Sequence, residues 1–148
     1  MIDLKSVPVF FNTSLATRAT KYLKTQTYLD YTTIEIFLKN NFNNEFPFGY
    51  VVINQTDKIV GFLGTMFSNR TENETKYLYC NLHTWIIDKN YRLNFFSCSE
   101  IILGPIFKYN CTFFAKPVRA LIRLFLKNFG MQKLEMKYRV IFLLNFYS

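Results

Sequence analysis

The chain has 148 residues, half of them hydrophobic and 19% charged, so its composition excludes a disordered chain. This length is typical of one domain, and we expect residues 1–148 to fold as a single unit with a sizeable core. The net charge of +8 favours a polyanionic partner, such as nucleic acid, an acidic membrane surface or a phosphorylated cofactor, although a coding bias toward Lys, Asn, Phe, Tyr and Ile explains the charge equally well.

Cysteine usage and hydropathy bear on the location of the chain. Cys80, Cys98 and Cys111 are odd in number and have apolar neighbours, as expected of reduced thiols in the core. The sequence has no CxxC motif and no cluster of His and Cys, so we expect no metal site. Its longest apolar runs, such as Val140–Leu144, are far shorter than a membrane span. The sequence therefore predicts a cytoplasmic protein with no membrane span.

In chain order, the first predicted elements are a short strand and two helices. Val7–Phe11 contains Pro8, and proline is tolerated in a strand at the edge of a sheet. Ser14–Lys24 and Tyr31–Phe42 are both compatible with a helix, and in the second one apolar residues recur at helical spacing.

The strongest β signal follows these helices. Tyr50–Ile53 and Ile59–Phe67 are rich in strand-forming residues and flank the polar segment Asn54–Lys58, so they predict an antiparallel hairpin. We expect Ser68–Thr75 to form a charged loop. Lys76–Ile87 should form the next strand, and its weak alternation indicates that both of its faces are covered.

The remaining elements alternate between helix and strand. A helix over Ser97–Tyr109 should kink or end early at Gly104–Pro105, because proline removes a helix hydrogen bond. A short strand, Asn110–Lys116, precedes a second helix, Pro117–Phe129, which has a clear apolar stripe. Gln132–Phe146 gives one or two closing strands. This order predicts an α/β fold with a mixed sheet.

The junction after the Lys76–Ile87 strand has the chemistry of an anion site. Asp88–Asn90 breaks the strand, and Ser97 and Glu100 fit a capping box at the start of a helix. A strand that leads directly into a helix leaves backbone N–H groups at the positive end of the helix dipole, where they bind phosphate. Arg92 would add a fixed positive charge.

At this junction, Trp85–Arg92 resembles the coenzyme A-binding motif of the GNAT acetyltransferase superfamily. In that family, an aliphatic residue at the end of a strand is followed five positions later by Arg or Gln, and Ile87 and Arg92 have this spacing. Two glycines that are frequent in the family's next turn are replaced by Leu93 and Phe95, so the pyrophosphate loop is degenerate.

The resemblance extends beyond the motif. Lys58–Gly64 looks like the third strand of GNAT proteins, and Phe129–Met131 looks like the end of their late helix. The resemblance covers roughly Gly49 to Phe146. It implies a GNAT-like α/β fold, in which helices flank a central mixed, mostly antiparallel sheet, and it implies a V-shaped split between Thr84 and the strand that contains Cys111.

The resemblance also implies an activity, which is acyl transfer from acetyl-CoA or another acyl-CoA to an amine of a small molecule or a sugar nucleotide. The positions of the family that hold the pantetheine arm fall on Trp85 and Ile87. Those that hold the pyrophosphate fall on Arg92, Asn94, Phe95, Phe96 and Ser97. A tyrosine that often protonates the leaving thiolate falls on Leu126, which cannot donate a proton.

Two residues are candidates for the general base. His83 is the only histidine, and it titrates near neutrality when unperturbed. Asp88 follows the motif strand directly. Each has a structural alternative, because a lone strand histidine is commonly a satisfied core residue and a turn aspartate is commonly a cap. The row Arg119, Arg123 and Lys127 is best explained as a solvated helix face.

Two other functions compete with acyl transfer. The replaced glycines and Leu126 also suit a GNAT-like scaffold that binds CoA or a partner without catalysis. A basic nucleic-acid-binding domain is disfavoured, and it would require Tyr and Phe side chains on an open basic face. A homodimer remains open as the assembly.

Overall fold

The computed structural model describes residues 4–26, 29–30, 32, 45–115 and 131–132. Its contacts divide the chain into two compact units, Met1–Lys116 and Pro117–Ser148, and every described helix and strand belongs to the first. Apart from residues 32 and 132, the helices predicted over Tyr31–Phe42 and Pro117–Phe129, and the closing strands predicted over Gln132–Phe146, lie outside the described residues, as does Leu126.

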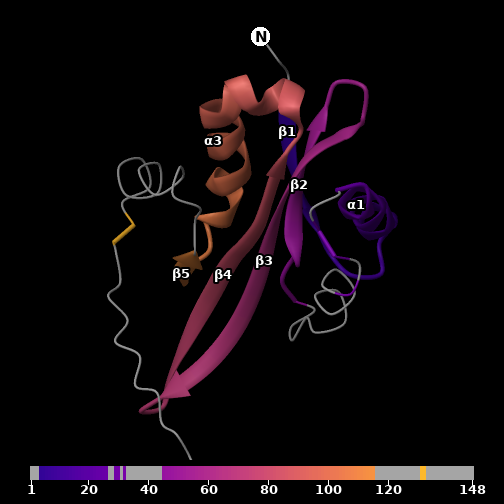
Figure 1. Ribbon diagram of the computed structural model, residues 1–148. Coiled ribbons are helices and arrows are strands. Elements are labelled where there is room, and N and C mark those ends of the chain that lie inside the picture. The colour runs from indigo at the N-terminus through magenta and orange to yellow at the C-terminus, as the bar shows by residue number, and fades with distance from the viewer. Residues whose placement is uncertain (1–3, 27–28, 31, 33–44, 116–130, 133–148) are drawn as a thin grey trace, which may run out of the picture. The chain divides into compact units, whose positions relative to one another are not determined.

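Five strands form one sheet in the order β1-β2-β3-β4-β5 (Figure 1). The strands are β1 (Leu4–Val9), β2 (Gly49–Asn54), β3 (Ile59–Glu72), β4 (Thr75–Ile87) and β5 (Thr112–Ala115). The first four pair antiparallel, and β4 pairs parallel with β5. The predicted fold class, an α/β fold with a mixed and mostly antiparallel sheet, is therefore confirmed.

The described helices are α1 (Ser14–Lys24), the 3-10 helix η1 (Lys89–Asn94) and α3 (Phe95–Ile106). The predicted bounds of α1 are confirmed, and Thr13 caps the helix by accepting a hydrogen bond from the backbone of Ala16 at 3.1 Å. A strand that contains Pro8 does lie at the edge of the described sheet, but it spans Leu4–Val9 and ends before Phe10 and Phe11. None of the helices within the described ranges is long and apolar enough to cross a membrane.

The two faces of the sheet are buried under different helices. One face packs against Ala19 and Leu23 of α1, and its buried residues include Val51, Phe62 and Ile86. Since side chains alternate along a strand, Tyr50 and Val52 of β2 point to the other face, where α3 packs on β1 and β2. Both of these residues are buried, as are Ile102, Leu103 and Ile106 of α3. Cover on both faces was predicted for the Lys76–Ile87 strand, and in β4 it holds for the adjacent residues Ile86 and Ile87, whereas Thr75–Tyr77 are exposed.

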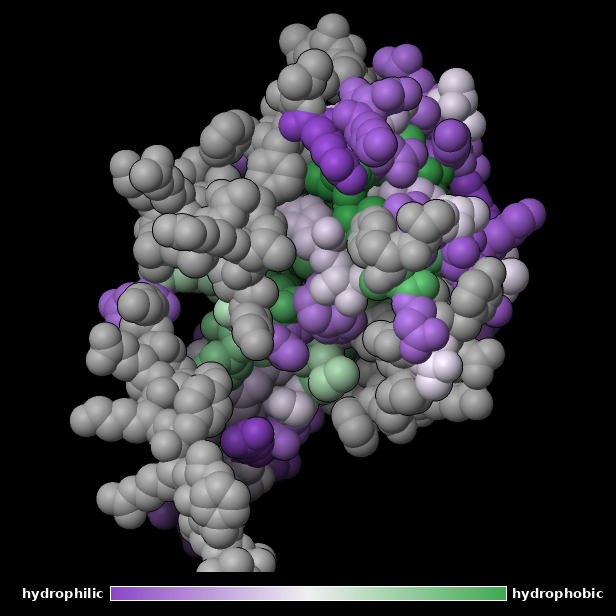
Figure 2. Space-filling model, in the orientation of Figure 1, coloured by the Kyte–Doolittle hydropathy of each residue, from purple (hydrophilic) through white to green (hydrophobic). Residues whose placement is uncertain are grey.

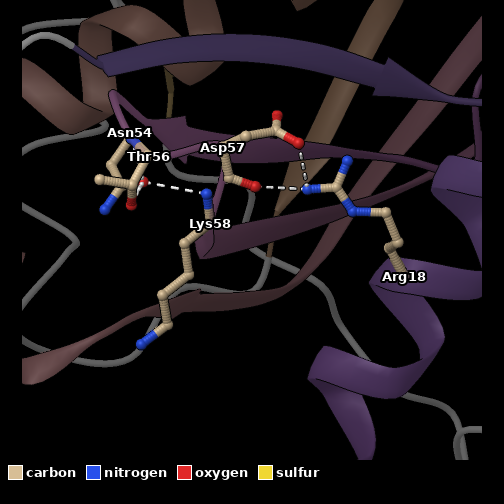
Figure 3. Close-up of polar contacts among 5 residues, drawn as sticks. All are labelled: Arg18, Asn54, Thr56, Asp57 and Lys58. Carbon is tan, nitrogen blue, oxygen red and sulfur yellow. Dashed lines mark hydrogen bonds and ion pairs between the residues drawn. The ribbon is translucent and has the colours of Figure 1, made fainter.

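The turn between β2 and β3 is tied to α1 (Figure 3). The side-chain oxygen of Asn54 accepts hydrogen bonds from the backbone N–H groups of Thr56 and Lys58, and Asp57 has a left-handed backbone with a φ of 58°. Arg18 of α1 donates to the carbonyl oxygen of Asp57 and forms an ion pair with its carboxylate at 3.0 Å. The predicted hairpin is thus confirmed, and a helix residue fixes its turn.

The loop predicted over Ser68–Thr75 is wrong. The ladder between β3 and β4 continues to Glu72 and Thr75, which leaves Asn73 and Glu74 as a two-residue turn. Both turn residues have positive φ, 47° and 66°, as a hairpin turn that matches the right-handed twist of the strands requires. Polar residues in this segment reflect the solvent exposure of a long hairpin and not an irregular loop.

The start predicted for the helix after β4 is also wrong. The 3-10 helix η1 leads directly into α3, which begins at Phe95, so Ser97 is the third residue of α3 and does not precede it. A capping box between Ser97 and Glu100 requires Ser97 to be the residue before the first helical turn. The early end of the helix is confirmed, because α3 stops one residue after Pro105.

Candidate active site

The second half of β4 is irregular. Gly64 pairs with His83 and Phe62 pairs with Ile86, so two residues of β4, Thr84 and Trp85, lie opposite a single residue of β3. This is a β-bulge, which bends a strand and increases its twist. Thr84 occupies it with a φ of 48°, a left-handed conformation that is unfavourable for a β-branched side chain.

The described pairing with β5 reaches Leu82, next to this bulge. The parallel register runs from Tyr79 and Thr112 to Leu82 and Ala115. Beyond Leu82, no strand within the described residues pairs with β4 on that side. The segment from His83 to Ile87 therefore follows the last described pair, and the expected split at Thr84 stays a prediction.

His83 of β4 is paired with Gly64 of β3, and its imidazole lies over that glycine. A Cβ atom at Gly64 would overlap the imidazole, at 2.7 Å from Nδ1 and 2.8 Å from Nε2. Nδ1 is 2.8 Å from the hydroxyl oxygen of Thr84, and the two form a hydrogen bond. Burial lowers the pKa of the His83 imidazole to about 4, so the ring is neutral at pH 7.

Asp88 is held by the backbone and by α1. Its backbone N–H donates to the carbonyl oxygen of Val60 at 2.9 Å, and its carboxylate accepts a hydrogen bond from the hydroxyl of Tyr22 at 2.8 Å. A strand rises about 3.3 Å per residue, so Asp88 lies roughly 15 Å along the chain from His83. The structure does not bring the two predicted base candidates together.

Trp85 and Ile87 follow the bulge on β4. Trp85 is partly buried, and Ile87 is buried with 6% of its surface exposed. The carbonyl oxygen of Ile87 accepts a hydrogen bond from Nε of Arg92 at 3.1 Å. The five-residue spacing that drew attention to this pair therefore corresponds to a direct contact, which closes the turn between β4 and η1. This bond uses one of the five N–H donors of the guanidinium.

The remaining predicted pyrophosphate ligands lie where η1 meets α3. Asn94 is the last residue of η1, and Phe95, Phe96 and Ser97 are the first three of α3. The first backbone N–H groups of a helix have no partner within the helix, so such a junction suits an anion. Leu93 lies within η1 and Phe95 is the first residue of α3, and residues within a helix do not need the positive φ that glycine permits.

A cavity of about 880 Å³ lies alongside α1. Phe48 and Phe11 line it together with Lys21 and Lys24, and most of the other described lining residues carry hydroxyl groups. Figure 2 shows a largely hydrophilic surface on the side where α1 lies. None of the predicted ligands is among the described lining residues, so the cavity is a feature that the motif did not indicate.

Aromatic rings are exposed on the first half of β4 and on β5. Tyr77 and Phe114 have 42% and 43% of their surface exposed, Tyr79 stacks on Phe114, and the guanidinium of Arg70 lies over the ring of Tyr79. The charged residues near the far end of the β3–β4 hairpin are two of each sign, Arg70, Lys76, Glu72 and Glu74. The patch is thus not basic, and it does not meet the requirement for a nucleic-acid-binding face.

Three residues that shape the end of β4 were not predicted from the sequence: Thr84, Gly64 and Tyr22. Thr84 reads as an ordinary strand former in sequence, and a bulge has no signature in composition. Gly64 had a signal, because a glycine within a strand indicates the close approach of another group. Tyr22 had none, because its partner Asp88 is 66 positions away. Among the described residues, no group of three or more His, Cys, Asp or Glu could hold a metal ion.

The arrangement described above is the fold of the GNAT acetyltransferases. An acetyltransferase of Trypanosoma brucei matches with a TM-score of 0.63 and 14% identity over 95% of this chain and 100% of the other. Glucosamine-6-phosphate N-acetyltransferase of Arabidopsis thaliana matches with a TM-score of 0.62 and 11% identity over 95% and 99%.

A third match is a predicted acetyltransferase of Clostridium acetobutylicum with acetyl-CoA, with a TM-score of 0.58 and 11% identity over 95% of this chain and 96% of the other. No protein-family model matches the sequence, and no curated protein matches it either. At these identities the likeness establishes the fold, and function has to be argued from the residues of the site.

Proposed function

We propose that this protein is an acyltransferase that moves an acetyl or other acyl group from a CoA thioester to an amine. The observation that supports this most directly is the end of β4, where the backbone bulges at Thr84 and the chain leads into two successive helices. This gives one continuous path with an extended backbone at one end and helix N–H groups at the other.

In this proposal, the two ends of the path bind the two parts of coenzyme A. The extended segment that contains Trp85 and Ile87 holds the pantetheine arm through its backbone. Arg92 and the residues that begin α3, Asn94, Phe95, Phe96 and Ser97, hold the pyrophosphate. The hydrogen bond from Arg92 to Ile87 supports this division, because it fixes the guanidinium where the strand ends.

The chemistry requires attack by a neutral amine on the thioester carbonyl, followed by cleavage of the C–S bond and protonation of the leaving thiolate. His83 is the candidate base at the bulge, and Asp88 lies closer to the phosphate end. An imidazole with a pKa of about 4 is a weak base, and it would take a proton from an alkylammonium of pKa about 10 at a cost of about 8 kcal/mol. We therefore expect the amine to lose its ionising proton to solvent before it attacks.

For the acceptor, we propose the cavity alongside α1. It is lined by Lys21 and Lys24, and none of its described lining residues is acidic. Such a lining favours an amine that also carries a phosphate or carboxylate group, as a sugar nucleotide does. Phe48 lies next to Gly49, which pairs with Gly64, and Gly64 pairs with His83. The cavity is thus two strands away from the bulge on the α1 side.

The first experiment is binding of acetyl-CoA and CoA, measured by calorimetry and by thermal unfolding. Ligand at about a hundred times its dissociation constant should stabilise the protein by about 2.7 kcal/mol, which is several degrees. Arg92→Ala should weaken binding about tenfold or more, because a charged hydrogen bond contributes about 1.5–3 kcal/mol. Arg70→Ala removes an arginine at the far end of the hairpin and should leave binding unchanged.

Turnover separates an enzyme from a scaffold that only binds. Release of free thiol from acetyl-CoA, in the presence of amines that carry phosphate or carboxylate groups, would support the acyltransferase. The six-residue 3-10 helix in place of a glycine-rich turn is the observation that favours the binding-only alternative. CoA binding without release of free thiol from acetyl-CoA, whichever amine is added, would favour that alternative. No CoA binding at all would contradict both.

A further inference from the structure

Thr84 differs in kind from the other residues with a left-handed backbone. Among the described non-glycine residues with positive φ, Asn12, Asp57, Asn73 and Glu74 all lie outside the strands. Thr84 lies within a strand, and its side chain is β-branched, which makes this conformation costly. A strained residue persists only when its surroundings hold it, and such residues gather at functional sites.

The surroundings that hold Thr84 are visible. Its hydroxyl is hydrogen-bonded to Nδ1 of His83, at 2.8 Å. The imidazole in turn lies over Gly64, where even a methyl group would collide with it. Gly64 and His83 are paired directly across β3 and β4, so the ring cannot take this position unless the opposite residue is glycine. The three residues form a chain of contacts from β3 to the bulge.

We infer that Thr84 is a positioning residue. His83, whose imidazole packs over Gly64, holds Thr84 in the left-handed conformation through their hydrogen bond, and the bulge in β4 thereby keeps the shape that the acyl thioester requires. This inference rests on the proposed function. In it, the hydroxyl of Thr84 does not touch the reacting atoms. It acts through the backbone of β4. Without the hydrogen bond, this backbone would relax toward regular pairing with β3.

Two substitutions at the same position test the role of the hydroxyl. Thr84→Ser keeps the hydroxyl, and Thr84→Ala removes it and leaves a small side chain in the same backbone. Thr71→Ala, at an exposed position near the end of β3, is the matched control. Three quantities are measured for each variant: the melting temperature, the dissociation constant of CoA with the KM for acetyl-CoA, and the ¹⁵N chemical shifts of the imidazole.

The imidazole measurement does not depend on a ligand. His83 is the only histidine in the sequence, so its ring signals need no assignment. Thr84→Ala should shift the Nδ1 signal, whereas Thr84→Ser and Thr71→Ala should leave it unchanged. If the Nδ1 signal of Thr84→Ala equals that of the wild type, the hydrogen bond does not exist in solution and the inference is wrong.

The binding measurement tests what the contact does. We expect Thr84→Ala to raise the dissociation constant of CoA and the KM for acetyl-CoA about tenfold, which corresponds to about 1.4 kcal/mol, with a smaller change in kcat. Thr84→Ser should stay within about twofold of the wild type. A shifted Nδ1 signal with unchanged CoA binding would overturn the positioning role, and a wild type that binds no CoA would overturn the proposed function itself.

Discussion

The two halves of the β3–β4 pair are built from the same two strands and yet differ in regularity. From Glu72 and Thr75 to Gly64 and His83, the ladder keeps a single register over nine pairs without interruption. From His83 to Ile87, the register shifts, one residue adopts a left-handed backbone and the described pairing with β5 ends. Side chains of the far half are exposed near the turn and become buried toward Gly64, whereas the near half combines the partly buried His83, Thr84 and Trp85 with the buried Ile86 and Ile87.

The contrast shows where this fold departs from local rules. The far half follows strand propensity and a two-residue turn, both of which are local properties of the chain. The near half places a threonine in a conformation that its side chain disfavours, beside a partly buried imidazole and a glycine on the next strand. Departures of this kind are expected at functional sites. The proposed CoA site therefore belongs to the near half.

Acidification should lower the stability of the folded protein through His83 in the near half. Burial lowers the pKa of His83 from 6.5 to about 4, so the folded state binds fewer protons than the unfolded state between these values. Stability is complete above pH 6.5 and is lost as the pH falls toward 4, by an amount on the order of 3 kcal/mol. The melting temperature between pH 7 and pH 4 measures this loss.

A variant without the titrating group provides the control for acidification. His83→Gln should be less stable than the wild type at pH 7 but should lose less stability on acidification, so the two curves converge near pH 4. Parallel curves would mean that another group controls the acid transition, and would remove the evidence that this imidazole is buried and neutral.

A pair of glycine substitutions compares the near half with a site elsewhere. Gly64→Ala should cost about 1–3 kcal/mol, because the added methyl group collides with the imidazole of His83. Gly104→Ala, in α3, adds a methyl group with nothing beyond its chain neighbours within 4 Å and should change stability by less than about 1 kcal/mol. Urea unfolding measures both, and equal costs would contradict the close approach of the ring at Gly64.

The smallest expected effect lies outside both halves. Arg18 and Asp57 are 43% and 67% exposed, and exposed ion pairs contribute between about 0 and 1 kcal/mol. Arg18→Ala should therefore lower the free energy of unfolding by at most about 1 kcal/mol and leave CoA binding unchanged. A loss of CoA binding in this variant would show that the turn after β2 contributes to the site. It would contradict a CoA site confined to the near half of the β3–β4 pair and the start of α3.

Much of the fold could be predicted from sequence because its determinants are local. The stretch Ser14–Lys24, expected to be compatible with a helix, forms α1, and the β2–β3 hairpin follows from two apolar runs around a polar segment. The spacing of Ile87 and Arg92 identified a pair that is in contact. These features depend on residues close together in the chain.

The parts that sequence did not reveal depend on backbone conformation or on distant partners. Asn73 and Glu74 look like the middle of a loop, although they form a tight turn, because polar composition does not distinguish the two. Ser97 matches a capping box in sequence, but η1 precedes it and α3 already begins at Phe95. Thr84 looks like any strand residue, and its bulge becomes visible only from the register of β3.

The most direct test of the central claim is the response of the backbone amides to acetyl-CoA, followed by ¹H–¹⁵N NMR. The account predicts shifts in the near half, at His83 to Ile87 and at the start of α3, while the amides of Thr75 to Tyr79 in the same strand stay unchanged. Shifts confined to the far half, or no shifts at saturating acetyl-CoA, would contradict a CoA site at the end of β4.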